Sequence, residues 1–379
     1  MLTYRRYMPA AVTRTATHVI QKWSYFWPPL AFVVLLFSWG MHVAVAGSIV
    51  LAVILAGAVM AAVEHAEVVA HKVGEPFGSL ILALAVTVIE VGMIVMLMLS
   101  GASGATTLAR DTVFSATMLT TNMIIGMALL VATGTTKGAL AYFNKEGAGT
   151  AFSAVLVIAT GTMVLPSVTT TAPEGRFATS QLVFIAVIAL LVWVFFVLTQ
   201  TRGHRDFFLP ISKKGEIIRP SEHAARPSTR RTLVSLVLLA VSLVAVVGLS
   251  KVLSYPIEDA VTVLGFPEAV VGLVIAIVVL MPETIAAFKN ARKGRTQIAM
   301  NLGYGSALAS IGLTIPVVGA ISIFLDKPIV LGLEPVHLVL FALTGVLSIL
   351  TIVQGRAVRL QGAMHLVVAA AYIFLVAVP

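Results

Sequence analysis

The chain has 379 residues, of which 59% are hydrophobic and 11% are charged, and it contains no cysteine. Soluble domains carry about 25% charged residues, so this composition excludes a water-soluble core and indicates a polytopic membrane protein. Without cysteine there is no disulfide, no thiolate metal site and no thiol chemistry.

The apolar segments alternate with short polar turns along most of the chain. Residues 1–26 are basic, and we expect no removed signal peptide, because the apolar sequence after them continues at once into a second span. About 20 apolar residues cross a bilayer as a helix. Eleven segments are predicted to do so, near 29–42, 44–66, 78–100, 111–133, 150–170, 179–200, 232–253, 265–288, 298–323, 333–353 and 361–378.

Lysine and arginine are distributed unequally between the two sides of this predicted bundle. With the N-terminus in the cytoplasm and eleven spans, all but four of the 25 basic residues lie on the inner side, the exceptions being Arg110, Arg176, Lys251 and Lys327. Such an asymmetry is typical of membrane proteins and explains the net charge of +9 without a nucleic-acid partner. It also explains the basic, proline-containing stretch 201–231 as a cytoplasmic linker.

An internal repeat divides the chain around this linker. A shift of 193 residues aligns Glu75 with Glu268 and Glu90 with Glu283, and aligns Ala116-Thr117 with Ala309-Ser310. Five spans on each side of the linker give the halves opposite orientations, an arrangement typical of secondary transporters. We therefore predict an all-α integral membrane protein with an extra N-terminal helix and a 5+5 inverted repeat. Its parts are residues 1–43 (N-terminal segment and extra helix), 44–200 (first repeat), 201–231 (linker) and 232–379 (second repeat).

Two glutamates lie deep within apolar spans, one in each half. An ionised acid near mid-membrane costs at least about 3 kcal/mol, so Glu90 and Glu283 are the primary candidates for a functional site. Two carboxylates that share a low-dielectric site cannot both stay ionised without a counter-charge. Two protons or one divalent cation would neutralise them equally well, and the two states exclude each other, which is the basis of antiport. A permanently protonated, structural pair is the alternative.

Further features of the sequence add candidates around this pair. Pro282 precedes Glu283 and predicts a break in the second-half helix, whereas the first half has Ile89 at that position. Calcium takes six to eight oxygen ligands, more than two glutamates supply. Supporting ligands are therefore expected among hydroxyl and amide side chains, although buried Ser and Thr usually bond to their own helix: Thr87, Thr117, Thr121, Asn122, Thr284, Ser306 and Ser310.

A cluster of acids and histidines lies near the inner end of the second span. Glu64, His65, Glu67 and His71 recur at helical spacing, but their order differs from the HExxH zinc motif. One interpretation is a solvated helix end stabilised by local pairs. The other is a path for proton entry or a cytosolic sensor.

The stretches around the two glutamates resemble the repeats of a known transporter superfamily. HAEVVAHKVGEPFGSLILALAVTVIEV, and the second-half segment with AMN-x-x-x-GS-x-LA, are similar to the calcium/cation antiporter superfamily, most closely its bacterial ChaA-type calcium (or sodium)/proton exchangers. The resemblance implies ten core helices, alternating access, Glu90 and Glu283 as exchanging carboxylates, and Thr121-Asn122 and Gly305-Ser306 in the site-lining helices. Vacuolar relatives have Gly-Asn-Ala before each glutamate, which this chain lacks, and relatives often have an acidic linker.

These observations together predict a secondary cation/proton antiporter, not an enzyme, that exports Ca²⁺ in exchange for H⁺. A Na⁺/H⁺ or K⁺/H⁺ antiporter is the first alternative and a passive cation channel is a remote one. We expect no cofactor and no nucleic-acid partner; the partners are the lipid bilayer, inorganic cations and protons, and a homo-oligomer is left open. The expected location is the bacterial inner membrane, with multiple spans and a cytoplasmic N-terminus.

Overall fold

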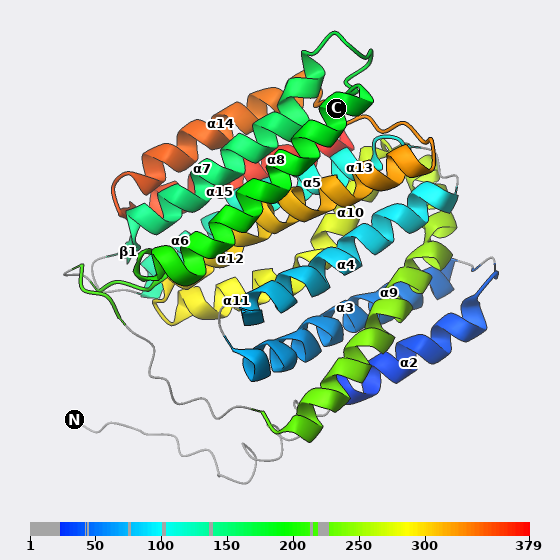
Figure 1. The fold of residues 1–379 in the computed structure, drawn as a ribbon, viewed down its shortest axis with the longest axis horizontal. Helices are drawn as coiled ribbons and strands as arrows, with labels where there is room; N and C mark the ends of the chain where they lie inside the picture. Colours follow the sequence, from blue (N-terminus) through cyan, green and yellow to red (C-terminus); the bar gives the residue numbers. More distant parts are fainter. Residues whose placement is uncertain are drawn as a thin grey trace.

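The computed structural model describes residues 23–41, 43, 45–74, 77–100, 104–135, 139–212, 215–218 and 227–379. The predicted N-terminal segment before Trp23, most of the linker beyond residue 218, and Glu75, which the repeat aligns with Glu268, lie outside these ranges. The described chain is a helical bundle (Figure 1), with one small antiparallel pair of strands.

Apolar helices account for the predicted spans. Eight stretches among the described residues are long and apolar enough to cross a membrane, and one bent pair makes a ninth. Two further helices coincide with predicted segments but have shorter apolar stretches, so the number of eleven spans stays a prediction. The helices are α2 (Trp23–Ser38), α3 (Val45–Val73), α4 (Phe77–Ser100), α5 (Leu108–Met118), α6 (Ile125–Thr135), α7 (Lys145–Ala159), α8 (Thr179–Leu198), α9 (Thr229–Leu264), α10 (Ala269–Val279), α11 (Met281–Arg292), α12 (Thr296–Ala309), α13 (Ile315–Phe324), α14 (Pro335–Ile352) and α15 (Arg359–Ala377).

Short segments of other geometry interrupt or extend these helices. π-helical turns join α5 to α6 (η1, Leu119–Ile124), join α12 to α13 (η6, Ser310–Thr314), and extend α7 (η2, Thr160–Val164) and α8 (η4, Thr199–Gly203). Two 3-10 turns follow, η3 (Leu165–Ser167) and η5 (Arg205–Phe208), and the strands are β1 (Leu140–Tyr142) and β2 (Arg356–Val358). The strands pair where α6 leads to α7 and α14 leads to α15, so the sheet ties the two halves together at one end.

Two large hydrophobic cores divide the bundle, and a third, small cluster lies between α6, α11 and α12. One is built mainly from α2, α3, α4, α9 and α10, and the other from α5 to α8 with α12 to α15. Both cores take residues from α4 and α10, and Figure 1 shows these helices between the two groups. Since each core mixes first-half and second-half helices, the halves interlock rather than fold as separate bodies. We call the region between the two large cores, along α4 and α10–α11, the seam. A side chain that points into it from either helix lies between the two cores.

The packing of one half has a counterpart in the other. The first helices of the predicted halves, α3 and α9, pack against each other. The last helix of each half packs on the other half's interrupted span: α15 lies against α6 and η1, and α8 lies against α13 and η6. The 193-residue shift maps η6 onto residues 117–121, which overlaps η1, so a wide turn recurs at the same place in both halves.

The described part of the linker is more ordered than a flexible connection. After α8 the chain continues through η4 and η5, and Phe208 is buried, with its ring packed edge-on against that of Phe196. The α9 helix begins at Thr229, with the side chain of Ser228 accepting a hydrogen bond from the backbone N–H of Arg231. It then runs well beyond the predicted end near 253, because Pro256 is accommodated within the helix.

Candidate functional site

A bend in the second half places Glu283 at the start of a helix. α10 and α11 meet at an angle of 51°, and Glu283 lies in the first turn of α11, directly after Pro282. Proline has no N–H to continue the helix of α10, and its ring clashes with the preceding turn. The predicted break is therefore confirmed. α4 passes through Ile89 and Glu90 without interruption, which confirms that the break is not symmetric.

Both glutamates line one cavity in the seam between the two cores. The cavity has a volume of about 180 Å³. Its walls come from α4, the end of α5, α8, α10–α11 and α12, so both halves contribute. The polar groups that line it are Thr87, Glu90, Gln200, Glu283, Asn301, Ser306 and Ser310.

The two carboxylates have different surroundings within this cavity. Glu90 is 3% exposed, and its Oε1 accepts a hydrogen bond of 2.5 Å from the hydroxyl of Ser310, the first residue of η6. Glu283 has its Oε2 buried with no hydrogen-bond partner among the residues that the structure describes. A buried acceptor without a partner is costly. Oε2 of Glu283 is thus free to bind a proton or a cation.

Three of the seven predicted supporting residues reach the cavity, and four do not. Thr87, Ser306 and Ser310 line it. The hydroxyls of Thr117, Thr121 and Thr284 donate instead to carbonyl oxygens of their own helices, at 2.8, 2.6 and 2.7 Å, as is usual for buried threonine. In this arrangement they do not face the cavity, and a ligand role for them stays a prediction.

Asn122 does not line the cavity either. It lies in the π-helical turn η1, a geometry that is frequent at functional sites. Its Nδ2 donates to the hydroxyl of Thr344 at 3.0 Å, and its Oδ1 is 3.2 Å from Nδ1 of His365 on α15. His365 in turn contacts Thr351 through Nε2 at 3.3 Å. This buried network holds η1 against α14 and α15, so the amide of Asn122 is already bonded there.

Two of the four acids and histidines of α3, Glu64 and His65, make hydrogen bonds outside the cavity. Ser24 of α2 donates to Oε1 of Glu64 at 3.2 Å, and His65 bridges the carbonyl of Ser24 at 2.9 Å and the hydroxyl of Ser235 at 3.3 Å. No group of three acids and histidines that could hold a metal ion occurs in the described part of the chain. Through its two ring nitrogens, His65 joins α3 to α2 and α9. A proton-path or sensing role stays a prediction for Glu64, His65, Glu67 and His71.

Comparison with known proteins identifies the family. Residues 43–202 and 234–378 match the family described as sodium/calcium exchanger protein. The chain belongs to this family. It is 42% identical over 326 residues to a putative ionic transporter, y4hA, of Sinorhizobium fredii, with 86% of this chain and 87% of the relative covered. It is 33% identical over 354 residues to the sodium-potassium/proton antiporter ChaA of Escherichia coli, with 92% and 94% covered.

Solved structures of similar fold agree with this assignment. The Ca²⁺/H⁺ antiporter protein YfkE superposes with a TM-score of 0.67 at 18% identity, covering 96% of this chain and 100% of that one. An H⁺/Ca²⁺ exchanger, CAX, superposes with a TM-score of 0.64 at 15% identity, covering 96% and 92%. At these identities the likeness concerns the fold alone. The family match and the 33% identical relative, together with this fold, make the exchanger a multi-pass, all-α membrane protein of the calcium/cation antiporter superfamily.

Sequence reasoning missed two polar residues that line the cavity of this exchanger. Gln200 lies in η4, and Asn301 lies in α12 within the AMN motif. Asn301 accepts a hydrogen bond from Gln297 at 2.9 Å and donates to the carbonyl of Phe208 at 2.7 Å, which ties the start of the linker to the cavity wall. The AMN motif was a usable signal for Asn301, whereas nothing in the sequence separates Gln200 from other polar residues at the end of a span.

Proposed function

We propose that this protein is a secondary active cation/proton antiporter that exports Ca²⁺ in exchange for H⁺ through a site formed by Glu90 and Glu283. The observation that carries this proposal is that two carboxylates, one from each half, line one cavity between the two cores. Neutralisation by protons and neutralisation by a cation are mutually exclusive there. A site that accepts either load, and opens to one side at a time, couples the two fluxes.

The oxygen atoms around the cavity favour a hard cation. Both carboxylates and the hydroxyls of Thr87, Ser306 and Ser310 are hard oxygen ligands, of the kind that Ca²⁺ prefers. A cavity of about 180 Å³ leaves room for water molecules that complete the six to eight ligands of Ca²⁺. Na⁺ or K⁺ would need only one net negative charge. The likeness to a sodium-potassium/proton antiporter keeps monovalent exchange as the second candidate.

The position of the cavity suggests which side it serves. Gln200, at the end of the α8 span, and Asn301, near the start of α12, line its polar rim, and Asn301 is bonded to the beginning of the linker. The charge distribution predicts a cytoplasmic linker and N-terminus in the bacterial inner membrane. We therefore infer that this arrangement faces the cytoplasm, ready to load the cation that is exported.

The test is transport in proteoliposomes that contain the purified protein. An imposed pH gradient should drive uptake of Ca²⁺, or of Na⁺ or K⁺ if the monovalent candidate is right. Glu90→Gln and Glu283→Gln should each abolish the exchange, because an amide cannot alternate between negative and neutral states. Glu146→Gln is the matched control, since Glu146 is exposed at the start of α7. Full exchange by both cavity variants would refute the proposal.

A passive channel is separated by the form of the flux. Exchange at an occluded site saturates with cation concentration and requires the counter-ion, whereas a channel gives ohmic current without one. A single cavity lined by one carboxylate from each half favours exchange.

A further inference from the structure

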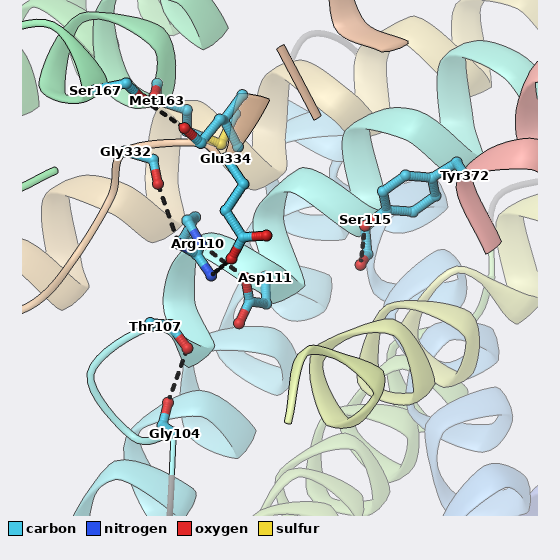
Figure 2. A network of polar contacts seen from close by, with 11 residues as sticks. Gly104, Thr107, Arg110, Asp111, Ser115, Met163, Ser167, Gly332, Glu334 and Tyr372 are labelled. Atoms are coloured by element: carbon cyan, nitrogen blue, oxygen red, sulfur yellow. Dashed lines mark hydrogen bonds and ion pairs between the residues drawn. The ribbon is translucent and has the colours of Figure 1, made fainter. Parts of the chain in front are cut away.

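A second polar network lies at the end of α5 opposite the turn that leads into η1, and the proposed ion site does not use it. Arg110 is at its centre and makes three contacts (Figure 2). Its Nε is 2.7 Å from Oδ1 of Asp111, its Nη1 donates to the carbonyl of Gly332 at 3.1 Å, and its Nη2 is 3.5 Å from Oε1 of Glu334. Arg110 and Asp111 are each 6% exposed, so this is a buried ion pair rather than a solvated one.

The carbonyl that Arg110 binds belongs to a segment, residues 329–334, that we call the strap. The strap connects α13 to α14 in the second half, and all of its anchors lie in the first half. Its backbone N–H groups donate to Thr106, Gly175 and Met163, and Ser167 donates to the carbonyl of Leu333. Three apolar side chains of the strap are buried, namely Ile329, Leu331 and Leu333, and Val330 is half-buried.

The strap lies so close to the first half that no side chain would fit between them. A Cβ on Gly332 would be 2.7 Å from Cα of Gly175 and 3.0 Å from the backbone N of Ser167. Figure 2 shows the guanidinium of Arg110 bonded to the carbonyl of Gly332 and paired with Glu334. Leu333, between these two residues, is bonded to Ser167 and Met163. The two halves are therefore sealed against each other at this end.

The seal is aligned with the ion cavity along two helices. On α5, Arg110 lies six residues before Ala116, which lines the cavity. Six residues of helix correspond to about 9 Å along the helix axis. All residues of α5 are buried. On α10, a Cβ on Gly272 would be 2.8 Å from the backbone of Asp111, and Ala276, one turn further on, lines the cavity. A path from the glutamates to this end of the molecule would pass between α5 and α10 and emerge under the strap.

We propose that the Arg110–Asp111 pair and the strap form the outer gate of the transport pathway. The gate is closed here, while the cavity extends toward the linker end. This inference rests on the proposed antiport, because only a carrier needs to open its two ends in turn. Opening separates the strap from Arg110 and lets water reach both charges. Arg110 and Asp111 thus determine access to the glutamates without binding the ion.

Thiol labelling tests the gate independently of transport, since the chain has no cysteine of its own. Ala309→Cys lines the cavity and reports which side reaches it. In the variant that carries Ala309→Cys alone, a membrane-impermeant maleimide should label this cysteine mainly from the linker side. Arg110→Gln should raise labelling from the opposite side at least fivefold. Lys251→Gln is the control, because Lys251 is another of the four basic residues predicted on that side but lies on α9 over the ring of Trp39, and it should leave the ratio unchanged.

A reversible cross-link gives a second test that does not depend on how Arg110→Gln folds. Thr106→Cys combined with Val330→Cys joins the strap to the first half where Val330 N–H donates to the carbonyl of Thr106 at 2.9 Å. Oxidation should lower cation/proton exchange at least tenfold and reduction should restore it, while either single variant is unaffected by oxidant. Exchange at the parental rate by fully cross-linked protein, or an unchanged labelling ratio in folded Arg110→Gln, would overturn the gate. Absence of exchange in the parent protein would instead refute the antiport proposal.

Discussion

Replacing Ser310 with alanine isolates one hydrogen bond of the proposed ion site. The hydroxyl of Ser310 donates to Oε1 of Glu90 over 2.5 Å and links η6 of the second half to α4 of the first. Hydrogen bonds to charged groups contribute about 1.5–3 kcal/mol, and about 1.4 kcal/mol corresponds to tenfold in affinity. Groups that orient a metal ligand change affinity by about 10- to 100-fold. Ser310→Ala should therefore raise the half-saturating cation concentration about 10- to 100-fold.

The measurement is the initial rate of uptake driven by a pH gradient, taken over a range of Ca²⁺ and Na⁺ concentrations. Ser310→Thr keeps the hydroxyl and should recover most of the affinity. Ser306→Ala removes a hydroxyl from the same cavity with no described bond to Glu90, so its effect should be smaller. Half-saturation within twofold of the parent protein in Ser310→Ala, for both cations, would refute the idea that this bond orients the carboxylate.

Three further predictions follow from the same geometry. Lowering the pH on the cation side by one unit should raise the half-saturating Ca²⁺ concentration, because the carboxylates must be deprotonated to bind a cation. The increase should be up to about 100-fold if two protons compete and about tenfold if one does. A half-saturating concentration that does not change with pH would contradict proton competition. Pro282→Ala restores the missing N–H and should straighten the 51° bend that positions Glu283. The exchange rate of the folded variant should then fall more than tenfold. An exchange rate equal to that of the parent protein would show that the bend is not needed. Gly126→Ala brings a Cβ within 2.8 Å of the carbonyl of Gly362 and should destabilise the bundle by about 1–3 kcal/mol in thermal unfolding in detergent, whereas Gly134→Ala on the same helix meets nothing within 4 Å and should not; equal melting temperatures would contradict this packing.

Hydropathy and proline chemistry carry most of what the sequence predicted correctly. A membrane span has to be apolar over a fixed length, so the helices coincide with the predicted segments even where η1 or η6 interrupts them. The break at Pro282 was predictable because a missing N–H is a local property of the chain. The ends of helices were less predictable, as Pro256 shows. The membrane and helix packing around α9 accommodate a proline that would end many shorter helices.

The direction in which polar side chains point depends on contacts that the sequence does not contain. Asn122 was predicted to be a ligand of the ion, but its amide is bonded to Thr344 and His365, more than 200 residues away in the sequence. The pair of Arg110 and Asp111 was visible as two charges at the start of a span. The burial of this pair under the strap depends on the close approach of Gly332 to Gly175. No pattern in the sequence predicts that these two glycines meet.

The unequal treatment of the two glutamates is itself an argument for two exchanging states. The 193-residue shift pairs Ser310 with Thr117 and Glu90 with Glu283, so a symmetric bundle would have Thr117 donating to Glu283 wherever Ser310 donates to Glu90. In this structure only the bond from Ser310 to Glu90 is made. Thr117 donates to the carbonyl of Val113 instead, and Oε2 of Glu283 has no partner among the described residues. A helical threonine can move its hydroxyl between its own helix and a neighbour by a single side-chain rotation. When the linker-side cavity closes and the strap opens, we expect the two hydroxyls to exchange roles, with Thr117 turned toward Glu283 and Ser310 turned back to its own helix.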